Sequence, residues 1–371
     1  MNAKNMSLLI KRQGLAAALP LLFVLLSCCT TNTTKPEKPK KSEKEKAKSF
    51  FINKPLKDEM VQLGSNFDVL IGTNKELQPD SVVVSHNGKK MDLYSTGNFS
   101  FSCNPAIYKP GRKLIDINIF YSDSLAETHR VFLLFLPIDA PKQLSYKVVR
   151  SFPHDPEAYT QGLFYHKGYL YESTGQPNRS SVRCVDPKTG EVLRKRKLEP
   201  QYFGEGIALV GDEIFMLTYR EHKGFVFKRD DFSLIRTFDL QTEEGWGLTN
   251  YGNKLLLSDG SAFIYFFNPE FFTLESQIEV CNNTRLVNNL NELELTPDGL
   301  FANIYGQNTI VAIDPETGIV THTLDLSALF PPDVPHDMDH VLNGIAYNPD
   351  TKTYYITGKQ WPVMYEIGIF R

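Results

Sequence analysis

The stretch FGEGIALVGDEIFMLTY, residues 203–219, decides the fold. Glu205 opens one apolar strand, and Ile214-Phe215-Met216-Leu217 makes a second. The same kind of opening recurs along the chain at intervals of 44, 41, 46 and 51 residues. The five openings are Gln161-Gly162-Leu163, Glu205-Gly206-Ile207, Trp246-Gly247-Leu248, Glu292-Leu293-Glu294 and Asn343-Gly344-Ile345.

Units of this length match the four strands in one blade of a β-propeller. Residues 141–371 number 231, or about 46 for each of five units. The last unit ends at Arg371 one strand short, while Leu144-Ser145-Tyr146-Lys147-Val148-Val149 is a spare strand ahead of the first unit. We therefore predict an all-β fold in which residues 141–371 form a five-bladed β-propeller, closed non-covalently by that spare strand.

Upstream of the repeat, residues 51–140 contain short β-rich segments separated by turn signals. Ser81-Val82-Val83-Val84 and residues 114–119 are examples of these strands, and Asn87-Gly88 is a hairpin signal. The pattern predicts a small Ig-like β-sandwich. This segment carries no chemical motif, and we expect it to act as a spacer.

The first 28 residues have the pattern of an export signal. A positive start precedes a 12-residue apolar core, 15–26, which is shorter than the roughly 20 residues of a membrane-spanning helix. The core ends in Leu25-Leu26-Ser27-Cys28, which resembles a bacterial lipobox. By that resemblance residues 1–28 are a lipoprotein signal peptide and Cys28 carries the lipid. An ordinary signal peptide is the alternative, and Cys29 is a second candidate for acylation.

Residues 29–50 are rich in Lys and predict a flexible tether. We accordingly expect a lipid-anchored protein of the bacterial cell envelope that faces the periplasm. The net charge of −3 lacks the basic excess that nucleic-acid binding requires. Cys103, Cys184 and Cys281 have no metal-binding spacing and are interpreted as small buried apolar residues, with a disulfide left open because the chain is exported.

The repeat brings chemistry-bearing residues together. If each opening begins the innermost strand of a blade, its residues converge near the propeller axis. This first ring comprises Gln161, Glu205, Trp246, Asn291 and Asn343. The ends of the next strands form a second ring, which comprises Glu172, Tyr219, Asp259, Tyr305 and Lys359. Equivalent positions on two blades, such as Glu205 to Tyr219 and Asn291 to Tyr305, are both 14 residues apart.

Six short strings around these positions occur in a fixed order. They are Tyr159-Thr160-Gln161-Gly162-Leu163, Phe203-Gly204-Glu205-Gly206, Gly245-Trp246-Gly247-Leu248, Leu290-Asn291-Glu292-Leu293-Glu294, Leu342-Asn343-Gly344-Ile345-Ala346 and Thr357-Gly358-Lys359-Gln360-Trp361-Pro362. Together they resemble the plant and bacterial type of glutaminyl cyclase (glutaminyl-peptide cyclotransferase) over essentially 141–371. The resemblance implies an enzyme that converts the N-terminal glutamine of peptides and proteins to pyroglutamate and releases ammonia.

The resemblance also implies roles for individual residues. Glu205 is implied as the proton shuttle, with Lys359 and Asn291 polarising the amide carbonyl. The implied substrate pocket comprises Tyr159, Gln161, Phe203, Tyr219, Trp246 and Tyr305. Tyr219 and Tyr305 stand where tryptophan is expected, which preserves an aromatic wall but leaves affinity and substrate preference open. The family's fold accommodates structural calcium, and no catalytic metal is expected.

This reaction needs no enzyme nucleophile, because the substrate's α-amine attacks its own side-chain amide. Since an α-amine has a pKa of about 7.7–8.0, a base assists at neutral pH and can pass the proton to the departing ammonia. A glutamate beside aromatic rings is partly desolvated, which raises its pKa toward the useful range. A fixed lysine and an asparagine amide stabilise the charge that develops on the amide oxygen.

Structural roles compete with these assignments. Glu205 and Lys359 could be ordinary strand and turn residues, while Trp361 is favoured as propeller core. Structural roles are expected for Glu172, Asp259, Glu292 and Glu294, and a metal site at His336-Asp337-Met338-Asp339-His340 is a minor alternative. Two other functions stay open: a non-catalytic propeller binding module, and a metal-dependent propeller hydrolase, which would need several axial Asp, Glu, Asn or His ligands.

Overall fold

The computed structural model describes residues 48–371, with gaps at 75, 96–98, 106, 108 and 123–124. The described residues form β-strands joined by turns and loops, with one short 3₁₀ helix, η1 (Ser327–Leu329). Within these ranges no helix is both long and apolar enough to cross a membrane. The predicted signal peptide, the lipid site Cys28 and nearly all of the predicted tether lie outside the described residues.

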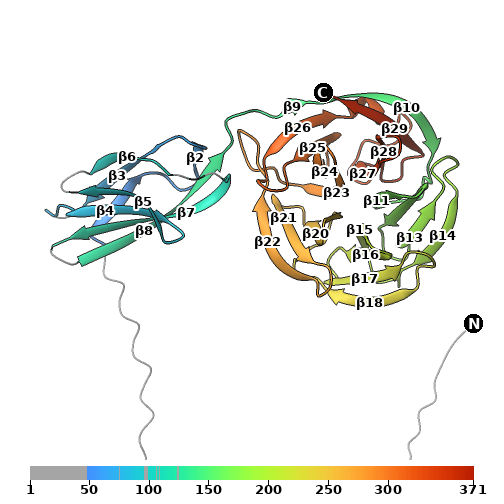
Figure 1. Ribbon diagram of the computed structural model, residues 1–371, viewed down its shortest axis with the longest axis horizontal. Helices are drawn as coiled ribbons and strands as arrows, with labels where there is room; N and C mark the ends of the chain where they lie inside the picture. The colour runs from blue at the N-terminus through green and yellow to red at the C-terminus, as the bar shows by residue number, and fades with distance from the viewer. Residues whose placement is uncertain (1–47, 75, 96–98, 106, 108, 123–124) are drawn as a thin grey trace, which may run out of the picture. The chain divides into compact units, whose positions relative to one another are not determined.

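Two sheets at the start of the described chain share one apolar core (Figure 1). One has the strand order β1-β3-β6 and the other the order β2-β8-β7-β4-β5. Alternate residues of β7, such as Ile115 and Ile117, are buried with Val69 and Phe135. The strands are β1 (Phe50–Lys54), β2 (Glu59–Gln62), β3 (Phe67–Thr73), β4 (Ser81–His86), β5 (Lys89–Ser95), β6 (Ser100–Cys103), β7 (Gly111–Tyr121) and β8 (Leu125–Leu136).

Five further antiparallel sheets follow, and we call each four-stranded set a blade. Blade 1 has β11 (Thr160–His166), β12 (Tyr169–Thr174), β13 (Ser181–Val185) and β14 (Val192–Lys197). Blade 2 has β15 (Gly204–Val210), β16 (Glu213–Thr218), β17 (Lys223–Lys228) and β18 (Leu234–Asp239). Blade 3 has β19 (Leu248–Tyr251), β20 (Lys254–Ser258), β21 (Phe263–Asn268) and β22 (Thr273–Glu279).

The remaining two blades include strands from before the repeat. Blade 4 has β23 (Leu290–Thr296), β24 (Gly299–Ile304), β25 (Thr309–Ile313) and β26 (Val320–Asp325), with the short β9 (Lys142–Gln143) added in parallel to β26. Blade 5 has β27 (Leu342–Asn348), β28 (Thr353–Gly358), β29 (Val363–Phe370) and β10 (Ser145–Pro153).

The first strands of the five blades surround a common centre. Strands β11, β15, β19, β23 and β27 contact one another in chain order, and β27 also contacts β11, so the ring is closed (Figure 1). The successive four-stranded sheets are consistent with propeller blades. The predicted all-β class is confirmed, and each predicted opening lies at or just before the first strand of a blade.

The predicted closing strand is also confirmed. Strand β10 pairs antiparallel with β29, with Ser145 opposite Phe370 at one end and Pro153 opposite Val363 at the other. The observed strand is longer than the predicted one. It completes blade 5 from the N-terminal side of the repeat, so the ring is closed by backbone hydrogen bonds.

Glycine at the second position of an opening is required by close approach between blades. A Cβ atom on Gly206 would lie 2.5 Å from the backbone nitrogen of Leu248 in the next blade. A Cβ atom on Gly162 would lie 2.6 Å from the backbone nitrogen of Ile207. Rigid backbone cannot yield as a flexible side chain can, so any larger residue must push neighbouring blades apart.

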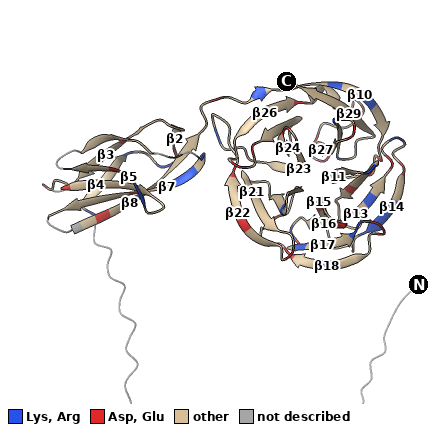
Figure 2. Ribbon diagram, viewed as in Figure 1, with Lys and Arg blue, Asp and Glu red and all other residues tan. Residues whose placement is uncertain are grey.

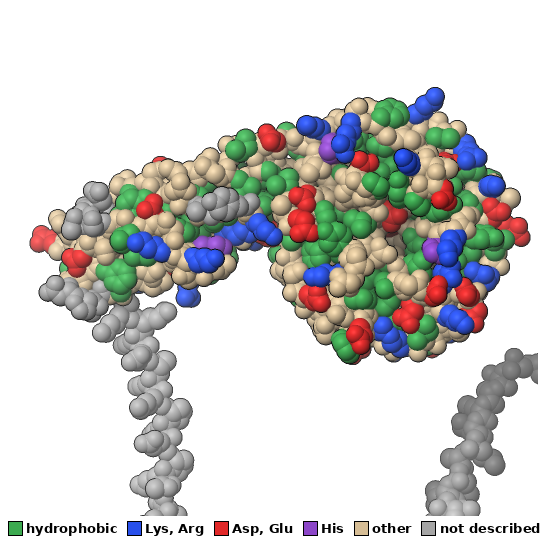
Figure 3. Space-filling model, viewed as in Figure 1, with side chains coloured by type: hydrophobic (Ala, Val, Ile, Leu, Met, Phe, Trp, Pro, Cys, Tyr) green, Lys and Arg blue, Asp and Glu red, His purple; other side chains and the backbone are tan. Residues whose placement is uncertain are grey.

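Charged residues of both signs lie along the ring. Figure 2 marks Lys and Arg beside Asp and Glu on the outer strands, with a basic run on β14. On the face in Figure 3 the two signs are interspersed among apolar and neutral side chains. This distribution agrees with the small net charge of −3 and gives no broad basic surface on that face.

The close approach of the first strands yields a stability prediction. Gly206→Ala is expected to lower the free energy of unfolding by about 1–3 kcal/mol, the usual cost of overpacking. Gly368→Ala is the matched control, because Gly368 has no left-handed φ and a Cβ there meets nothing within 4 Å. Urea unfolding of both variants measures the effect. A Gly206→Ala midpoint equal to that of wild type would contradict this account.

Candidate active site

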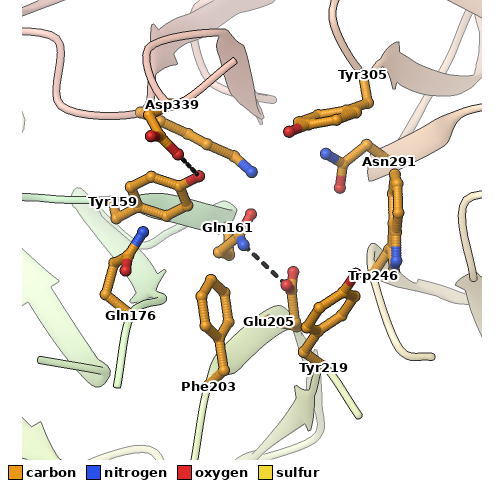
Figure 4. A pocket seen from close by; sticks show the side chains of 11 residues that line it. Tyr159, Gln161, Gln176, Phe203, Glu205, Tyr219, Trp246, Asn291, Tyr305 and Asp339 are labelled. Carbon is orange, nitrogen blue, oxygen red and sulfur yellow. Dashed lines mark hydrogen bonds between the residues drawn. The ribbon is translucent and has the colours of Figure 1, made fainter. Parts of the chain in front are cut away.

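A cavity of about 260 Å³ lies where all five blades converge at one end of the ring. Its lining comes from residues at the start of first strands and just after second strands, with one loop residue added (Figure 4). The lining residues are Tyr159, Gln161, Gln176, Phe203, Glu205, Tyr219, Trp246, Asn291, Tyr305, Asp339 and Lys359. The cavity therefore combines two carboxylates, one lysine, three amides and five aromatic rings.

The floor of the cavity is polar but secluded from water. Gln161 and Asn291 are 2% exposed, and Glu205 is 4% exposed. The side-chain amide of Gln161 donates a hydrogen bond to the Glu205 carboxylate, with Nε2 to Oε1 at 2.8 Å (Figure 4). Gln161 is itself held by Asn343, whose amide donates to the Gln161 side-chain oxygen at 3.3 Å. This chain of amides orients the carboxylate from two adjacent blades.

The Glu205 carboxyl group has a strongly perturbed acidity. Burial raises its pKa well above the ordinary glutamate value, and the charges of Glu221 and Glu244 add to the increase. The nearby Lys359 ammonium opposes this effect but does not outweigh it. A carboxyl group with a raised pKa can accept and return a proton near neutral pH.

Lys359 extends into the same cavity from the turn after β28. Its Nζ lies 4.7 Å from the ring centre of Tyr159 and 5.1 Å from that of Tyr305, so two aromatic faces hold the cation. Burial lowers its pKa to about 8, although Glu205 and Asp339 favour the charged form. The lysine and Glu205 pKa values are therefore shifted toward each other.

Asn291 presents unused hydrogen-bonding capacity. Its backbone carbonyl accepts a hydrogen bond from the Ser258 hydroxyl at 2.6 Å, which fixes the strand position. Its side-chain Oδ1 is buried and has no hydrogen-bond partner among the described residues. Since buried polar groups are normally satisfied, a ligand in the cavity is the natural partner for this side chain.

Aromatic rings form the walls of the cavity. Phe203 packs edge-on against Tyr159 with ring centres 6.0 Å apart and lies 5.7 Å from Tyr219. On the other side Trp246 packs edge-on against Tyr305 at 5.5 Å. These rings exclude water from the floor and leave a narrow apolar passage to it.

Two groups of charged residues flank these walls. The indole nitrogen of Trp246 donates to Glu244 at 2.8 Å, and Glu244 also pairs with Arg220, which lies over the Tyr219 ring. On the opposite side the Tyr159 hydroxyl donates to Asp339 at 3.0 Å (Figure 4). The rim thus fixes the orientation of the rings that shape the cavity.

The nine pocket and catalytic residues predicted from the sequence all line this one cavity. Their individual roles stay predictions. Gln176 and Asp339 were missed. Gln176 directly follows Gly175, the position 14 residues after Gln161, so the repeat spacing could have found its neighbourhood. Asp339 lies in the loop between η1 and β27, outside the periodic pattern.

The predicted second ring was wrong in blade 1. Glu172 lies within β12 and accepts hydrogen bonds from Thr160 and His154, while the position after the strand is Gly175. A side chain at Gly175 would collide with the Phe203 ring, which occupies this space instead. Glu172 therefore belongs to a buried network outside the cavity lining, in keeping with the structural role expected for it.

Other ring positions also bind neighbouring backbone or side chains. Asn343 donates to the Thr160 carbonyl at 2.9 Å, and Asp259 accepts from Ser261 and Tyr265. Neither lines the cavity. Glu292 accepts from the backbone nitrogens of Leu163 at 3.2 Å and Ile345 at 3.0 Å, and Glu294 accepts from that of Tyr347. These two glutamates tie neighbouring first strands together, rather than the Asn291 loop as predicted.

Trp361 is fully buried and donates from its indole nitrogen to the His340 carbonyl at 2.8 Å, which confirms its predicted core position. The metal alternative at residues 336–340 gains no support, because His336 stacks on Phe330 and His340 pairs with Asp337. Across the described residues no group of three or more His, Cys, Asp or Glu side chains could hold a metal ion. The expectations of structural calcium and of metal-free catalysis stay predictions.

The three cysteines of the described chain are buried and free. Burial raises the pKa of Cys103 and of Cys281 to about 12, so these thiols stay protonated at neutral pH. This state agrees with their interpretation as small apolar residues.

Comparisons with known proteins identify the family. Residues 120–369 match the family model of glutamine cyclotransferase. The chain is similar to a glutaminyl-peptide cyclotransferase of Arabidopsis thaliana, with 36% identity over 254 residues, 64% of this chain and 79% of that protein. It is also similar to the crystal structure of Myxococcus xanthus glutaminyl cyclase, with a TM-score of 0.58 and 32% identity over 62% of this chain and 98% of the other. The chain belongs to the glutamine cyclotransferase family.

Proposed function

We propose that this enzyme converts the N-terminal glutamine of peptides and proteins to pyroglutamate with release of ammonia. The observation that carries the proposal is the buried Glu205 carboxylate, which shares one cavity with Lys359, Asn291 and an aromatic wall. The family supports the same reaction. A hydrolase would need a water or an enzyme nucleophile, whereas ring closure of glutamine needs only a base, an acid and a folded substrate.

In the proposed mechanism the substrate's α-nitrogen attacks the carbon of its own side-chain amide. The Glu205 carboxylate takes the proton from the α-amine as the new C–N bond forms. It then delivers that proton to the amide nitrogen, which leaves as ammonia when the old C–N bond breaks. One proton moves from one nitrogen to the other, so no further reactant is consumed.

The other cavity residues stabilise and position the substrate in this proposal. The Lys359 ammonium and the Asn291 amide face the oxygen that becomes negative in the tetrahedral state. Gln161 keeps the Glu205 carboxylate oriented through its 2.8 Å hydrogen bond. Phe203, Trp246 and the two tyrosines hold the glutamine side chain bent toward its own amine, which lowers the entropic cost of ring closure.

We also propose a domain organisation for the chain. Residues 141–371 form a five-bladed β-propeller, and residues 51–140 form an Ig-like sandwich. The two strand orders β1-β3-β6 and β2-β8-β7-β4-β5 support the second assignment, because they match the A-B-E and A′-G-F-C-C′ sheets of an Ig fold. Residues 1–28 are proposed as a lipoprotein signal peptide and residues 29–50 as a tether that holds the enzyme at the bacterial envelope, facing the periplasm.

The proton shuttle is tested by Glu205→Gln. Glutamine keeps the size of the side chain and an acceptor for Gln161, but it cannot take up a proton at neutral pH. We expect kcat for ammonia release from a Gln-initiated peptide to fall by about 10²–10⁴-fold. Glu243→Gln, at an exposed position of the same blade's loop, is the control and should retain wild-type activity. Addition of a chelator should change neither result, whereas a chelator-sensitive activity would favour the metal-dependent hydrolase.

The two shifted pKa values predict a bell-shaped dependence of kcat/KM on pH. Activity rises with pH as the Glu205 carboxyl group and the substrate amine lose protons. It falls above about pH 8 as Lys359 loses the charge that stabilises the amide oxygen. In Lys359→Arg the alkaline fall should move to higher pH, since a guanidinium stays protonated. Lys352→Arg, at an exposed turn, should leave the profile unchanged. An alkaline limb common to all three proteins would contradict the assignment of Lys359.

The lipid anchor is tested by Cys28→Ala. The variant is expected to move from the membrane fraction to the soluble fraction after cell lysis, because acylation requires the Cys28 thiol and amine. Cys29→Ala is the matched control and should stay with the membranes. Incorporation of a radiolabelled fatty acid provides the direct measurement. Label retained in Cys28→Ala and lost in Cys29→Ala would transfer the lipid site to Cys29.

A further inference from the structure

The loop between η1 and β27 lies at the edge of the cavity and is tied to it by three hydrogen bonds. The Tyr159 hydroxyl donates to the Asp339 carboxylate at 3.0 Å. The Tyr305 hydroxyl donates to the Met338 carbonyl at 3.3 Å, and the Trp361 indole donates to the His340 carbonyl at 2.8 Å. The position of Asp339 is therefore fixed by residues of the cavity wall.

Asp339 differs from the other charged residues that line the cavity. Glu205 and Lys359 are both 4% exposed, whereas Asp339 is exposed to solvent. Farther out on the opposite rim, Arg220 and Glu244 form an ion pair at 2.5 Å and largely cancel each other's charge. The Lys359 cation near Asp339 lies inward, against the Tyr159 and Tyr305 rings. Asp339 thus presents negative charge to the mouth of the cavity.

The size and depth of the cavity determine which part of a substrate meets this charge. A volume of about 260 Å³ is small for a ligand pocket, so it takes the N-terminal glutamine and little more. The glutamine must reach the buried floor formed by Gln161, Glu205 and Asn291. Because one residue spans about 3.3–3.6 Å of extended chain, the second residue of the peptide lies at the mouth, where Asp339 is exposed.

We propose that Asp339 forms a subsite for a positively charged side chain at the second position of the substrate, so that peptides beginning Gln-Lys or Gln-Arg are preferred. The inference rests on the proposed cyclase function and extends it to substrate selection. The Tyr159 hydrogen bond occupies one carboxylate oxygen of Asp339 and aims the group. The second oxygen is available to a lysine or arginine side chain that crosses the rim.

The test uses three peptides that differ only at the second residue, which is lysine, Nε-acetyl-lysine or glutamate. Acetyl-lysine keeps the aliphatic stem and removes the charge, so the comparison isolates electrostatics. With wild-type enzyme at low salt we expect kcat/KM for lysine to exceed that for acetyl-lysine by about three- to fivefold, as for an exposed ion pair. Glutamate should be the poorest substrate. The ratio should approach one in about 1 M salt, where the screening length is about 3 Å.

Asp339→Asn removes the charge but keeps an oxygen that can accept the Tyr159 hydrogen bond. In this variant the lysine to acetyl-lysine ratio should fall to about one. Asp337→Asn is the matched control, since Asp337 is an exposed carboxylate of the same loop that pairs with His340 and does not line the cavity. Its ratio should equal that of wild type. Because each ratio compares two substrates on one enzyme, any common effect of Asp339 on Lys359 cancels.

Three outcomes would overturn the subsite. Equal kcat/KM values for lysine and acetyl-lysine with wild-type enzyme would show that the mouth does not select charge. A lower activity of Asp339→Asn on all peptides with an unchanged ratio would make Asp339 a positioning residue for Tyr159 and Lys359. No ammonia release from any of the peptides would overturn the proposed cyclase function together with the subsite, which distinguishes this failure from the other two.

Discussion

Neighbouring first strands approach so closely around the ring centre that the backbone of one blade occupies the space where a side chain of the next would begin. At Gly206 and Gly162 this contact tolerates only hydrogen. The residue before each of these glycines is thereby fixed at the end of the ring: Glu205 beside Gly206, and Gln161 beside Gly162. The requirement that closes the ring and the requirement that positions the floor of the cavity are thus met by the same short string, and the hydrogen bond between Gln161 and Glu205 follows from the adjacency of blades 1 and 2.

The chemistry of the site depends on burial more than on the pairing of charges. Glu205 and Lys359 carry opposite charges in one cavity, yet desolvation is the largest influence on both pKa values and prevails over their mutual attraction. An exposed pair of this kind would stay fully ionised and inert toward proton transfer near neutral pH. The aromatic wall, which includes Trp246 and Phe203, is therefore part of the acid–base machinery because it keeps water from the two groups.

Periodic features of this fold could be predicted from the sequence, whereas aperiodic ones could not. The spacing of the openings predicted the five sheets and the closing strand, and it collected Glu205, Asn291 and Lys359 at one end. It failed where one blade departs from the others. In blade 1 the equivalent position is Gly175, whose missing side chain makes room for Phe203, and no spacing rule reveals such an exchange between blades. Asp339 lies in a loop whose path is set by hydrogen bonds to distant side chains, so its place depends on tertiary contacts that the sequence does not display.

The residue that supplies the positive charge lies on the blade that is closed without a covalent link, and one buried network serves both needs. Directly after β10, His154 donates to or accepts from the carbonyl of Trp361 and the carboxylate of Glu172, at 2.7 and 3.0 Å. Burial alone would lower the pKa of His154, but Glu172 and the Trp361 carbonyl outweigh it and the pKa is raised, so the imidazolium donates to both partners. The turn that contains Lys359 is held further by the hydrogen bond from the backbone nitrogen of Gln360 to the Ala158 carbonyl at 2.7 Å. Opening the seam between β10 and β29 would therefore displace the Lys359 turn as well, which makes the integrity of the ring a condition for a complete active site.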